Sequence, residues 1–325
     1  MPDPTRSDLH PVSELVTNFT LAALQKKEDF TLNAGPFEVV NKRQGRYHTY
    51  TTGDWNRAEM QPRGPSSESA GSGWKISSDT YDIERFAVHK DNEWQDEDDA
   101  PDAIDLRQDA TDWLANQASI KGDILFQSLF TDAVWTTDYD GVAGSPSANE
   151  IKQWDASGSD PQADVEVLKA AVRALISLVP NTLIVGEDVH TTLLTHSVFR
   201  DAIKYTSETN SGSMNDKIAN WFGVQNYIVA RGQYNSAAEG ATAVMAPLLD
   251  ADDLLLCFLD PTPGPKKMTA FKSFVFNGRS GGSDGIVGRT MDIDLKTTTR
   301  YEIEYNIDVK LVAADAGAFV KTAVG

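Results

Sequence analysis

The strongest constraint on the fold is a helical segment that is followed at once by a strand. In residues 164–179 the apolar positions recur at alternating spacings of three and four, which is the period of one helix face. A Pro-Asn pair ends this helix, and the apolar run Thr182–Val185 follows as a strand. A second helix is predicted from Val189 to Tyr205 and a second strand from Val224 to Ala230. Strands that alternate with helices predict an α/β lobe whose helices pack on a sheet.

The C-terminal part of the chain has a different period. From Met268 onward the pattern is typical of antiparallel strands, and between Tyr301 and Leu311 every second residue is apolar. Such alternation predicts a strand with one buried face and one solvated face. Together with the helical segments, these strands place the chain in the α+β class.

The N-terminal part is expected to form an arm and a long hairpin. Residues 1–46 contain one short predicted helix, Ser13–Lys27, and otherwise lack a core-forming pattern. Two β-rich stretches, Tyr47–Thr52 and Lys75–Val88, flank a segment from Gln61 to Gly73 that is rich in Pro, Gly and Ser. This pattern predicts a hairpin whose tip is mobile.

A run of acidic residues leads into a long predicted helix. Ten acidic residues lie between Asp91 and Asp112, and a helical pattern begins at Pro101 and continues to about Trp135. Acidic groups at a helix N-terminus complement the helix dipole. At ~1.5 Å per residue the helix would be roughly 50 Å long, and a kink would be expected at Gly122. The acidic run is expected on a solvated surface near the base of the hairpin.

Charge and hydropathy exclude two classes of protein. With 48 acidic and 29 basic residues the formal charge is -19, so the chain as a whole repels the phosphate backbone. Direct reading of a DNA sequence is therefore not expected. No apolar run approaches the ~20 residues that span a bilayer, and the N-terminus lacks the pattern of a secretion signal. We expect no membrane partner and a protein kept in a reducing cytosol.

Two fragments resemble ligand-binding loops but lack a required part. Gly278–Gly285 is glycine-rich, yet it has neither the spacing nor the terminal Lys-Ser/Thr of a phosphate loop. Asp138–Gly141 begins like a calcium loop, but Asn149 stands at the twelfth position, where the motif needs a glutamate. The whole segment from Asp138 to Asp160 is predicted to be a solvated loop.

The remaining reactive side chains also lack the spacing that chemistry needs. His190 and His196 lie six residues apart on one predicted helix and miss the four-residue spacing of a zinc-binding face. Cys257 lies in an apolar run and is interpreted as a small buried hydrophobe. The acidic run Asp91–Asp99 is interpreted as a charged surface, with weak chelation of divalent ions as the alternative. We therefore assign no catalytic, cofactor-binding or metal-binding residue, and we expect neither a cofactor nor an enzymatic activity.

The order of these elements closely resembles the Hong-Kong-phage-type capsid fold, which tailed-phage major capsid proteins share with encapsulins. Tyr81–Val88 is similar to the strand that returns from the extended loop of that family, and Asp105–Phe130 is similar to its spine helix. Pro180–Gly186 with His190–Ile203 is similar to the strand and helix after the first axial helix. Ile218–Val224 resembles the hydrophobic-Phe-Gly-Val entry to the next strand.

The resemblance covers roughly residues 45–312 and implies a domain map and a function. The implied function is that of the major capsid protein of a tailed bacteriophage, which self-assembles as pentamers and hexamers into an icosahedral shell around double-stranded DNA. The implied map has an N-terminal arm at 1–46, an extended loop at 47–90, a peripheral lobe with the spine helix at 91–135 and 265–325, and an axial lobe at 136–264.

The resemblance also implies partners and a location. The partners are further copies of the chain, portal, scaffolding and decoration proteins, and packaged DNA that is bound without sequence-specific contacts. Scaffolding would come from another protein or from a segment cleaved earlier. The location is the virion capsid after synthesis in the host cytoplasm. In some relatives a lysine of the extended loop forms an isopeptide bond with an asparagine of a neighbour; Lys75 and Asn277 are candidates, although no motif assigns them that role.

Two other functions stay open from the sequence. One is an encapsulin-like compartment shell, which has the same fold and encloses a cargo enzyme instead of a genome. The other is a soluble α/β enzyme whose acidic run binds a metal.

Overall fold

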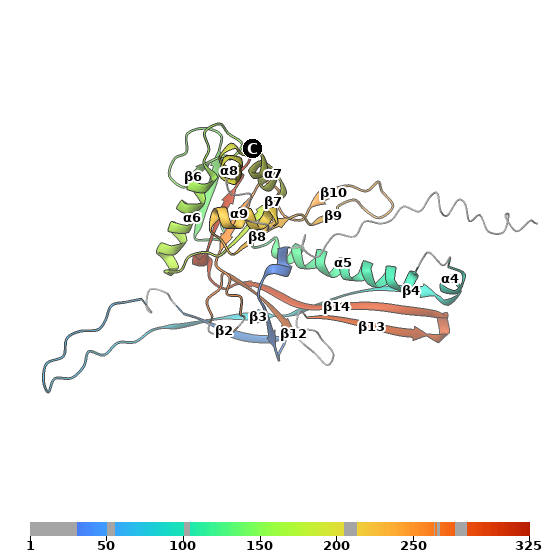
Figure 1. Cartoon of the computed structure of the whole chain (residues 1–325). Helices are drawn as coiled ribbons and strands as arrows, with labels where there is room; N and C mark the ends of the chain where they lie inside the picture. Colours follow the sequence, from blue (N-terminus) through green and yellow to red (C-terminus); the bar gives the residue numbers. More distant parts are fainter. Residues whose placement is uncertain are drawn as a thin grey trace, which may run out of the picture.

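The protein combines an elongated layer of long strands with an α/β lobe. The structure, a computed structural model, describes residues 31–50, 56–100, 105–204, 213–262, 264, 267–276 and 285–325. A long helix lies along the strands of the elongated layer, and the α/β lobe stands on one end of this layer (Figure 1). A thin loop projects from the end of the elongated layer on which the lobe stands. This combination of helices and sheets confirms the predicted α+β class.

The elongated layer is a five-stranded sheet built around its longest strand, β14. β14 pairs antiparallel with β4 on one side and with β12 and β13 on the other, and β1 adds parallel to β12. The predicted strand from Tyr301 to Leu311 is confirmed as the main part of β14. The strands are β1 (Phe37–Val40), β4 (Glu84–Glu93), β12 (Phe271–Phe276), β13 (Ile286–Ile293) and β14 (Thr298–Leu311).

One face of β14 is apolar, as predicted, but its other face is not simply solvated. Tyr301, Tyr305 and Ile307 are buried on the face that the long helix covers. On the opposite face Glu304 is 3% exposed and forms ion pairs with Arg85 of β4 and Arg289 of β13. Because neighbouring strands supply both guanidinium groups, this carboxylate is buried and still paired.

β12 and β13 form two parts of one line along β14. Val275 pairs with Ile307, and Ile286 pairs with Tyr305. Between these two pairs the chain advances by eleven residues from β12 to β13, while β14 advances by two. The chain leaves the ladder after β12 and returns at Gly285, which has a φ of +74°. A Cβ at Gly285 would lie 2.7 Å from the carbonyl oxygen of Asn306, so the return point requires glycine. The glycine-rich residues 278–284 themselves lie outside the described part of the chain.

The long helix is α5 (Leu106–Phe126), and it is shorter than predicted. Its N-cap is Asp105, whose side chain accepts hydrogen bonds from the backbone N–H groups of Arg107 and Gln108. Its 21 residues give about 31 Å at ~1.5 Å per residue, instead of roughly 50 Å. The helix ends because the chain turns after Phe126, which places Phe130 in the core at 2% exposure. No break in the helix occurs at Gly122, where a kink was expected.

The second sheet has six strands in the order β6-β5-β15-β11-β7-β8, with both parallel and antiparallel pairs. β7 and β8 are the two predicted strands of the α/β lobe. The strands are β5 (Thr137–Val142), β6 (Glu150–Lys152), β7 (Thr182–Gly186), β8 (Asn226–Ala230), β11 (Leu254–Cys257) and β15 (Gly317–Lys321).

Four helices accompany this sheet, and two predictions need correction. The predicted helix 189–205 is two helices, because the backbone is extended at His196, with ψ at 133°. The predicted loop 138–160 contains β5 and β6. The helices are α6 (Pro161–Ile176), α7 (Glu187–Thr195), α8 (Ser197–Lys204) and α9 (Met214–Phe222). A separate hairpin of β9 (Gln233–Asn235) and β10 (Met245–Pro247) follows β8, and 3-10 turns lie at Asp294–Lys296 and Ala314–Ala316.

The last strand of the chain changes the expected domain map. Residues 265–325 were assigned to the peripheral lobe, but β15 pairs with β5 and β11 and so belongs to the six-stranded sheet. The two sheets also share one hydrophobic core. Phe126 of α5 contacts Phe271 of β12 with ring centroids 5.1 Å apart, and Phe130 contacts Phe319 of β15 at 5.4 Å. The two sheets therefore meet through packed aromatic rings.

The described part of the N-terminal arm is built into the body. A 3-10 turn, η2 (Thr31–Ala34), lies against α5, where the buried Asp123 carboxylate accepts hydrogen bonds from the backbone N–H groups of Thr31 and Leu32 at 3.1 and 2.9 Å. β1 then joins the five-stranded sheet. The assignment of residues 1–46 to a free arm is thus wrong for residues 31–40. The predicted helix Ser13–Lys27 lies outside the described residues.

The predicted hairpin is present but narrower than 47–90. β2 (Gln44–Tyr50) pairs antiparallel with β3 (Ile76–Asp82). The returning stretch Lys75–Val88 divides at Ile83, which is 4% exposed and donates its N–H to the carbonyl of Arg43 at 2.9 Å. Beyond this point β4 belongs to the five-stranded sheet. The division has a simple cause, since a buried residue at the junction fixes the chain to the body.

Candidate functional surfaces

The two histidines of the predicted helix have separate hydroxyl partners. His190 is buried, and its Nδ1 lies 2.9 Å from the hydroxyl of Tyr227. The Nε2 of His196 lies 3.1 Å from the hydroxyl of Ser159. Burial lowers the pKa of His190, which favours its neutral form. Within the described ranges no group of three or more His, Cys, Asp or Glu side chains is arranged to hold a metal ion.

The other candidates from the sequence occupy structural positions. Cys257 is fully buried in β11, and burial raises the pKa of its thiol. Asp138 lies on a strand, where its carboxylate accepts the N–H of Ala133 at 2.9 Å. Partial burial raises the pKa of Asp138. Lys75 is exposed at the start of β3, and Asn277 lies outside the described residues, so their pairing stays a prediction.

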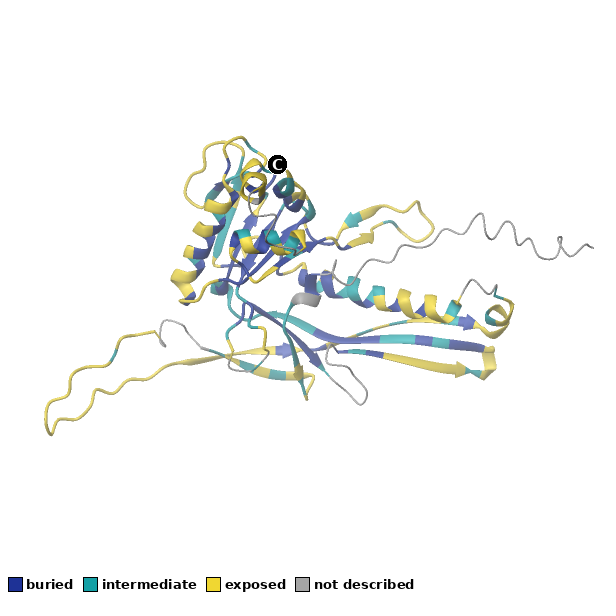
Figure 2. Ribbon diagram, viewed as in Figure 1, coloured by how far each residue is buried: buried dark blue, intermediate teal, exposed yellow. Residues whose placement is uncertain are grey.

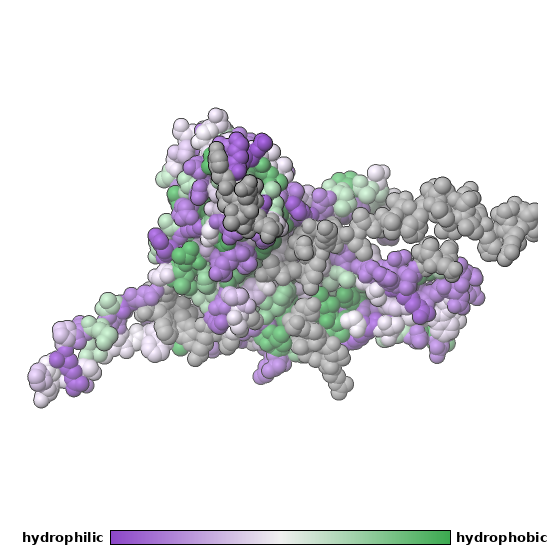
Figure 3. Space-filling model, in the orientation of Figure 1, coloured by the Kyte–Doolittle hydropathy of each residue, from purple (hydrophilic) through white to green (hydrophobic). Residues whose placement is uncertain are grey.

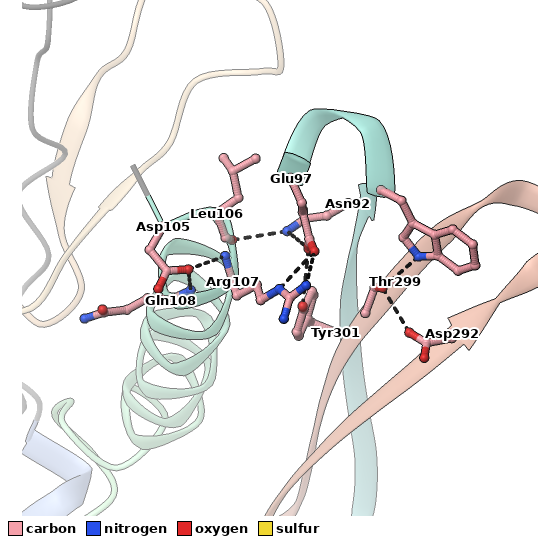
Figure 4. Close-up of polar contacts among 10 residues, drawn as sticks. Asn92, Glu97, Asp105, Leu106, Arg107, Gln108, Asp292, Thr299 and Tyr301 are labelled. Atoms are coloured by element: carbon pink, nitrogen blue, oxygen red, sulfur yellow. Dashed lines mark hydrogen bonds and ion pairs between the residues drawn. The ribbon is translucent and has the colours of Figure 1, made fainter. Parts of the chain in front are cut away.

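The acidic run forms a short helix, α4 (Trp94–Asp99), in which Glu97 is the one carboxylate bonded to the body and Trp94 also donates a hydrogen bond to Thr299 at 3.0 Å. The side chain of Glu97 is 8% exposed and accepts hydrogen bonds from Asn92, Arg107 and Tyr301 (Figure 4). Figure 4 shows these groups converging from α4, the end of β4, the start of α5 and β14. Glu97 therefore joins four elements, whereas Asp96, Asp98 and Asp99 are exposed.

The position of this acidic helix differs from the expected one. α4 follows the ten-residue strand β4, which pairs with β14 from Thr298 to Ile307. At a rise of ~3.3 Å per residue, β4 carries the chain roughly 30 Å along the sheet. Figure 1 shows α4 at the far end of the long strands, away from β2 and β3. The acidic run thus lies at the outer tip of the sheet and not at the base of the hairpin.

The loop between β2 and β3 is the most exposed part of the described chain. Every residue from 61 to 75 is exposed, and Figure 2 shows this segment as a long exposed projection. Its local structure is one turn, in which the Ser67 N–H bonds to the Gly64 carbonyl at 3.2 Å. Met60 is fully exposed and Trp74 is 59% exposed. A projection with apolar side chains and little internal structure has the form of a contact arm.

Two further apolar surfaces lie on the α/β lobe, and sequence reasoning missed both. The solvent side of α6 carries Val167 and Leu175, with Leu178 and Val179 just beyond its C-terminus, all exposed. The β9–β10 hairpin exposes Tyr234, Val244 and Met245. The predicted core-facing stripe of this helix was Val165, Leu168, Val172, Leu175 and Val179. It is wrong at Leu175 and Val179, which are exposed, because Ile176 is the residue that continues the buried face.

A groove of about 400 Å³ lies between α5 and the strands β4 and β14. Phe86, Val88 and Ile303 contribute its apolar wall, and the ammonium group of Lys121 lies 4.2 Å from the centroid of the Phe86 ring. The residues that line it include no carboxylate and no histidine. Such a groove can take up apolar groups, and its only titratable lining residues besides Arg85 are Lys121 and Tyr305.

None of the described helices is long and apolar enough to cross a membrane. The hydropathy surface mixes polar and apolar residues over both the lobe and the elongated layer (Figure 3).

Comparison with known proteins gives matches in structure only. No protein-family model and no curated protein sequence matches the chain. A crystal structure of a phage-related protein from Bordetella bronchiseptica is similar at 17% identity and a TM-score of 0.64, covering 97% of both chains. The capsid of cyanophage P-SCSP1u is similar at 11% identity and a TM-score of 0.57, covering 93% of this chain and 90% of that one. An encapsulin from Synechococcus elongatus is similar at 11% identity and a TM-score of 0.52, covering 96% and 94%. The likeness spans the whole fold.

Proposed function

We propose that this chain, which has the Hong-Kong-phage-type capsid fold, is the major capsid protein of a tailed bacteriophage. Its copies assemble as pentamers and hexamers into an icosahedral shell that encloses double-stranded DNA. The observation that carries the proposal is the loop between β2 and β3, in which every residue from 60 to 75 is exposed and which projects away from the core of the subunit (Figure 2).

The loop has the physical properties that a shell subunit needs. A two-stranded hairpin that projects alone is marginally stable in water, so it gains order when it lies on another subunit. Each such contact is modest, but closed symmetry repeats it many times, and the shell is held by the sum. The body that carries the loop is rigid, because both sheets share one core.

The charge of the chain agrees with a genome container. A formal charge of -19 gives little attraction to phosphate, so packaged DNA can move against the shell without being bound in a fixed register. The proposal includes no catalytic residue and no cofactor. Portal, scaffolding and decoration proteins are the other partners that it implies, and the virion capsid is the location.

The domain map is proposed with the boundaries that strand pairing supports. The arm is confined to the residues before η2, and the extended loop lies between β2 and β3. The peripheral lobe contains the five-stranded sheet with α5, and the axial lobe contains the six-stranded sheet, including β15.

An encapsulin-like shell is the second candidate, and one observation favours it. The encapsulin from Synechococcus elongatus covers almost the whole chain at a TM-score of 0.52, close to the value for the cyanophage capsid. The two candidates share the fold of the subunit and differ in what the shell contains.

The test is to purify the full chain and examine it by negative-stain electron microscopy and light scattering over a range of salt concentrations. Closed shells or rings of five and six subunits are the expected result. A species that stays monomeric at high concentration in every salt condition would refute the shell function. Nucleic acid in shells isolated from infected or producing cells supports the phage capsid, whereas shells that hold a cargo protein support the encapsulin.

A further inference from the structure

The α/β lobe carries an apolar surface that the described chain leaves uncovered. The buried face of α6 is formed by Val165, Leu168, Val172 and Ile176, which pack into the core. The opposite face exposes Val167 at 51% and Leu175 at 38%, and the exposed Ala170 and Ala174 lie between them. A surface helix normally presents polar residues to water, and a helix that is apolar on all sides is normally buried. The exposed polar residues of α6, Gln162, Glu166 and Arg173, leave an apolar strip of Val167, Ala170 and Ala174 that a partner can cover.

A second uncovered apolar surface is the β9–β10 hairpin. The side-chain Oδ1 of Asn235 stabilises its turn by accepting hydrogen bonds from the backbone N–H groups of Ala237 and Val244 at 3.1 and 2.9 Å. The two strands form a sheet of their own and pair with no other strand of the described chain. From Gln233 to Pro247 the only charged residue is Glu239, and Val244 and Met245 are more than half exposed. Figure 3 shows the hairpin as a largely apolar projection.

The two surfaces lie on opposite sides of one lobe. The hairpin follows β8, which is one edge of the six-stranded sheet. α6 lies toward the other edge, where Ala171 and Leu175 line a shallow depression together with residues of β5. Figure 1 shows α6 and the β9–β10 hairpin pointing away from each other. Two different surfaces on opposite sides of a subunit are the arrangement of a head-to-tail contact, which closes into a ring.

We propose that the β9–β10 hairpin of one copy of the chain lies on the solvent face of α6 of the next copy, around the axis of a ring. The proposal rests on the proposed shell function and names the contact that joins neighbours within one pentamer or hexamer. Charge is complementary across this contact. Glu239 is the single charge of the hairpin, and Arg173 stands at the border of the apolar face of α6; neither has an ion-pair partner among the described residues.

Cysteine cross-linking tests the contact directly. Ala174→Cys places a thiol on α6 and Ala243→Cys places one on the hairpin, at two exposed positions. The native Cys257 is fully buried and should not interfere. Under mild oxidation in assembling conditions, the double variant should give a ladder of covalent multimers on a non-reducing gel, whereas each single variant should give none. The two sites lie too far apart within one subunit to be joined there, so each link reports on a neighbour.

A charge exchange gives an independent readout. Arg173→Glu and Glu239→Arg should each slow association about tenfold at low salt, and the double variant should recover to within about twofold of the parent. Circular dichroism of the unassembled subunits controls for folding.

The outcomes separate this contact from the shell function. If shells form but the Ala174→Cys/Ala243→Cys pair gives no ladder, the proposed contact is wrong while the shell function stands. A ladder from Ala174→Cys combined with Met60→Cys in that case would identify the extended loop of the neighbour as the cover of α6. If the parent chain forms neither rings nor shells, both proposals fail together.

Discussion

At the scale of single residues, the closest packing of the α/β lobe is found at a glycine. Gly141 lies on β5 beside the end of β15, and a Cβ at this position would overlap the carbonyl oxygen of Thr322. The parallel pairing of the two strands therefore depends on the missing side chain. In the sequence this glycine belonged to a fragment that resembled a calcium loop. Its structural role is steric.

Gly141→Ala should accordingly destabilise the subunit. The added methyl group must push β15 away from β5, and overpacking of this kind costs about 1–3 kcal/mol. Thermal unfolding of the unassembled subunit, followed by circular dichroism, should show a midpoint lower by several degrees. Gly144→Ala is the matched control, because a Cβ at Gly144 meets nothing within 4 Å. Equal midpoints for the two variants would contradict the steric explanation.

A second residue-scale effect concerns Asp123, the buried carboxylate that binds η2 to α5. Burial raises the pKa of Asp123 to about 6, against the effect of its two backbone hydrogen bonds, which lower it. Between the ordinary aspartate pKa and about 6, the unfolded chain loses this proton and the folded chain keeps it. The free energy of unfolding should therefore fall as the pH rises through this range and level off above it.

The loss from this one group is at most about 3 kcal/mol, since each unit of pKa shift corresponds to ~1.4 kcal/mol. Urea unfolding of the unassembled subunit at pH 4, 5, 6 and 7 measures it. Asp123→Asn should remove part of the slope, although Asp253, whose pKa burial also raises to about 6, will still contribute. Asp109→Asn changes an exposed carboxylate of the same helix and should leave the slope as it is in the parent. An unchanged slope in Asp123→Asn would rule out this titration.

At the scale of elements, the clearest predictions from the sequence were those in which one period dominates. α6 and β14 follow periods of 3.6 and 2 over more than ten residues, and both were found within a few residues of the predicted ends. The length of α5 could not be predicted in the same way. Its helical pattern continues past Phe126, and only the tertiary burial of Phe130 shows that the chain must turn.

The functional surfaces were harder to predict than the elements. The loop between β2 and β3 was predicted, because Pro, Gly and Ser mark it locally. The β9–β10 hairpin was missed, because its strands are three residues long and carry no periodic signal. The place of the acidic run was predicted wrongly for a different reason. Nothing in the sequence shows that β4 runs away from the hairpin along β14, since strand partners distant in sequence are set by the whole sheet.

The corrected position of α4 gives a prediction at this scale. Asp96, Asp98 and Asp99 are exposed at the tip of the elongated layer, where we expect like-charge repulsion to slow the association of subunits. Changing these three residues to Asn should speed assembly several-fold at about 10 mM salt, where the Debye length is ~30 Å, and have little effect near 1 M. Light scattering after a change of buffer follows the rate.

Glu97→Gln is the contrasting variant for this experiment. Because Glu97 is bonded to Arg107, Asn92 and Tyr301, its replacement should lower the stability of the subunit and leave the salt dependence of assembly as it is in the parent. If the triple variant assembles at the parental rate in low salt, repulsion at the tip does not control association.

At the scale of the whole molecule, the shared core determines how unfolding and deletions affect the subunit. The ring contacts among Phe126, Phe130, Phe271 and Phe319 connect the two sheets, so the lobes should unfold together in one transition. The loop between β2 and β3 takes no part in this core. Stability and assembly can therefore be separated by a single deletion.

Replacing residues 55–74 with a short Gly-Ser turn should keep the thermal midpoint of the unassembled subunit within a few degrees of the parent, because residues 61–74 are all exposed and lie outside the hydrophobic core. The same variant should fail to close shells in electron micrographs. Normal shells would show that the loop is not an assembly contact. A subunit that unfolds outright would instead place the loop in the folding core.

The collinear strands β12 and β13 have a consequence for how this chain can change in evolution. Both strands pair with β14 on the same side, and the chain leaves their line after Phe276 and re-enters it at Gly285. The pairing with β14 fixes the places of Phe276 and Gly285 and depends only weakly on the number of residues between them. Lineages descended from a common ancestor can lengthen, shorten or exchange that segment while every register in the sheet is inherited unchanged. We expect a short peptide inserted between Phe276 and Gly285 to leave the register of β12 and β13 on β14 unchanged.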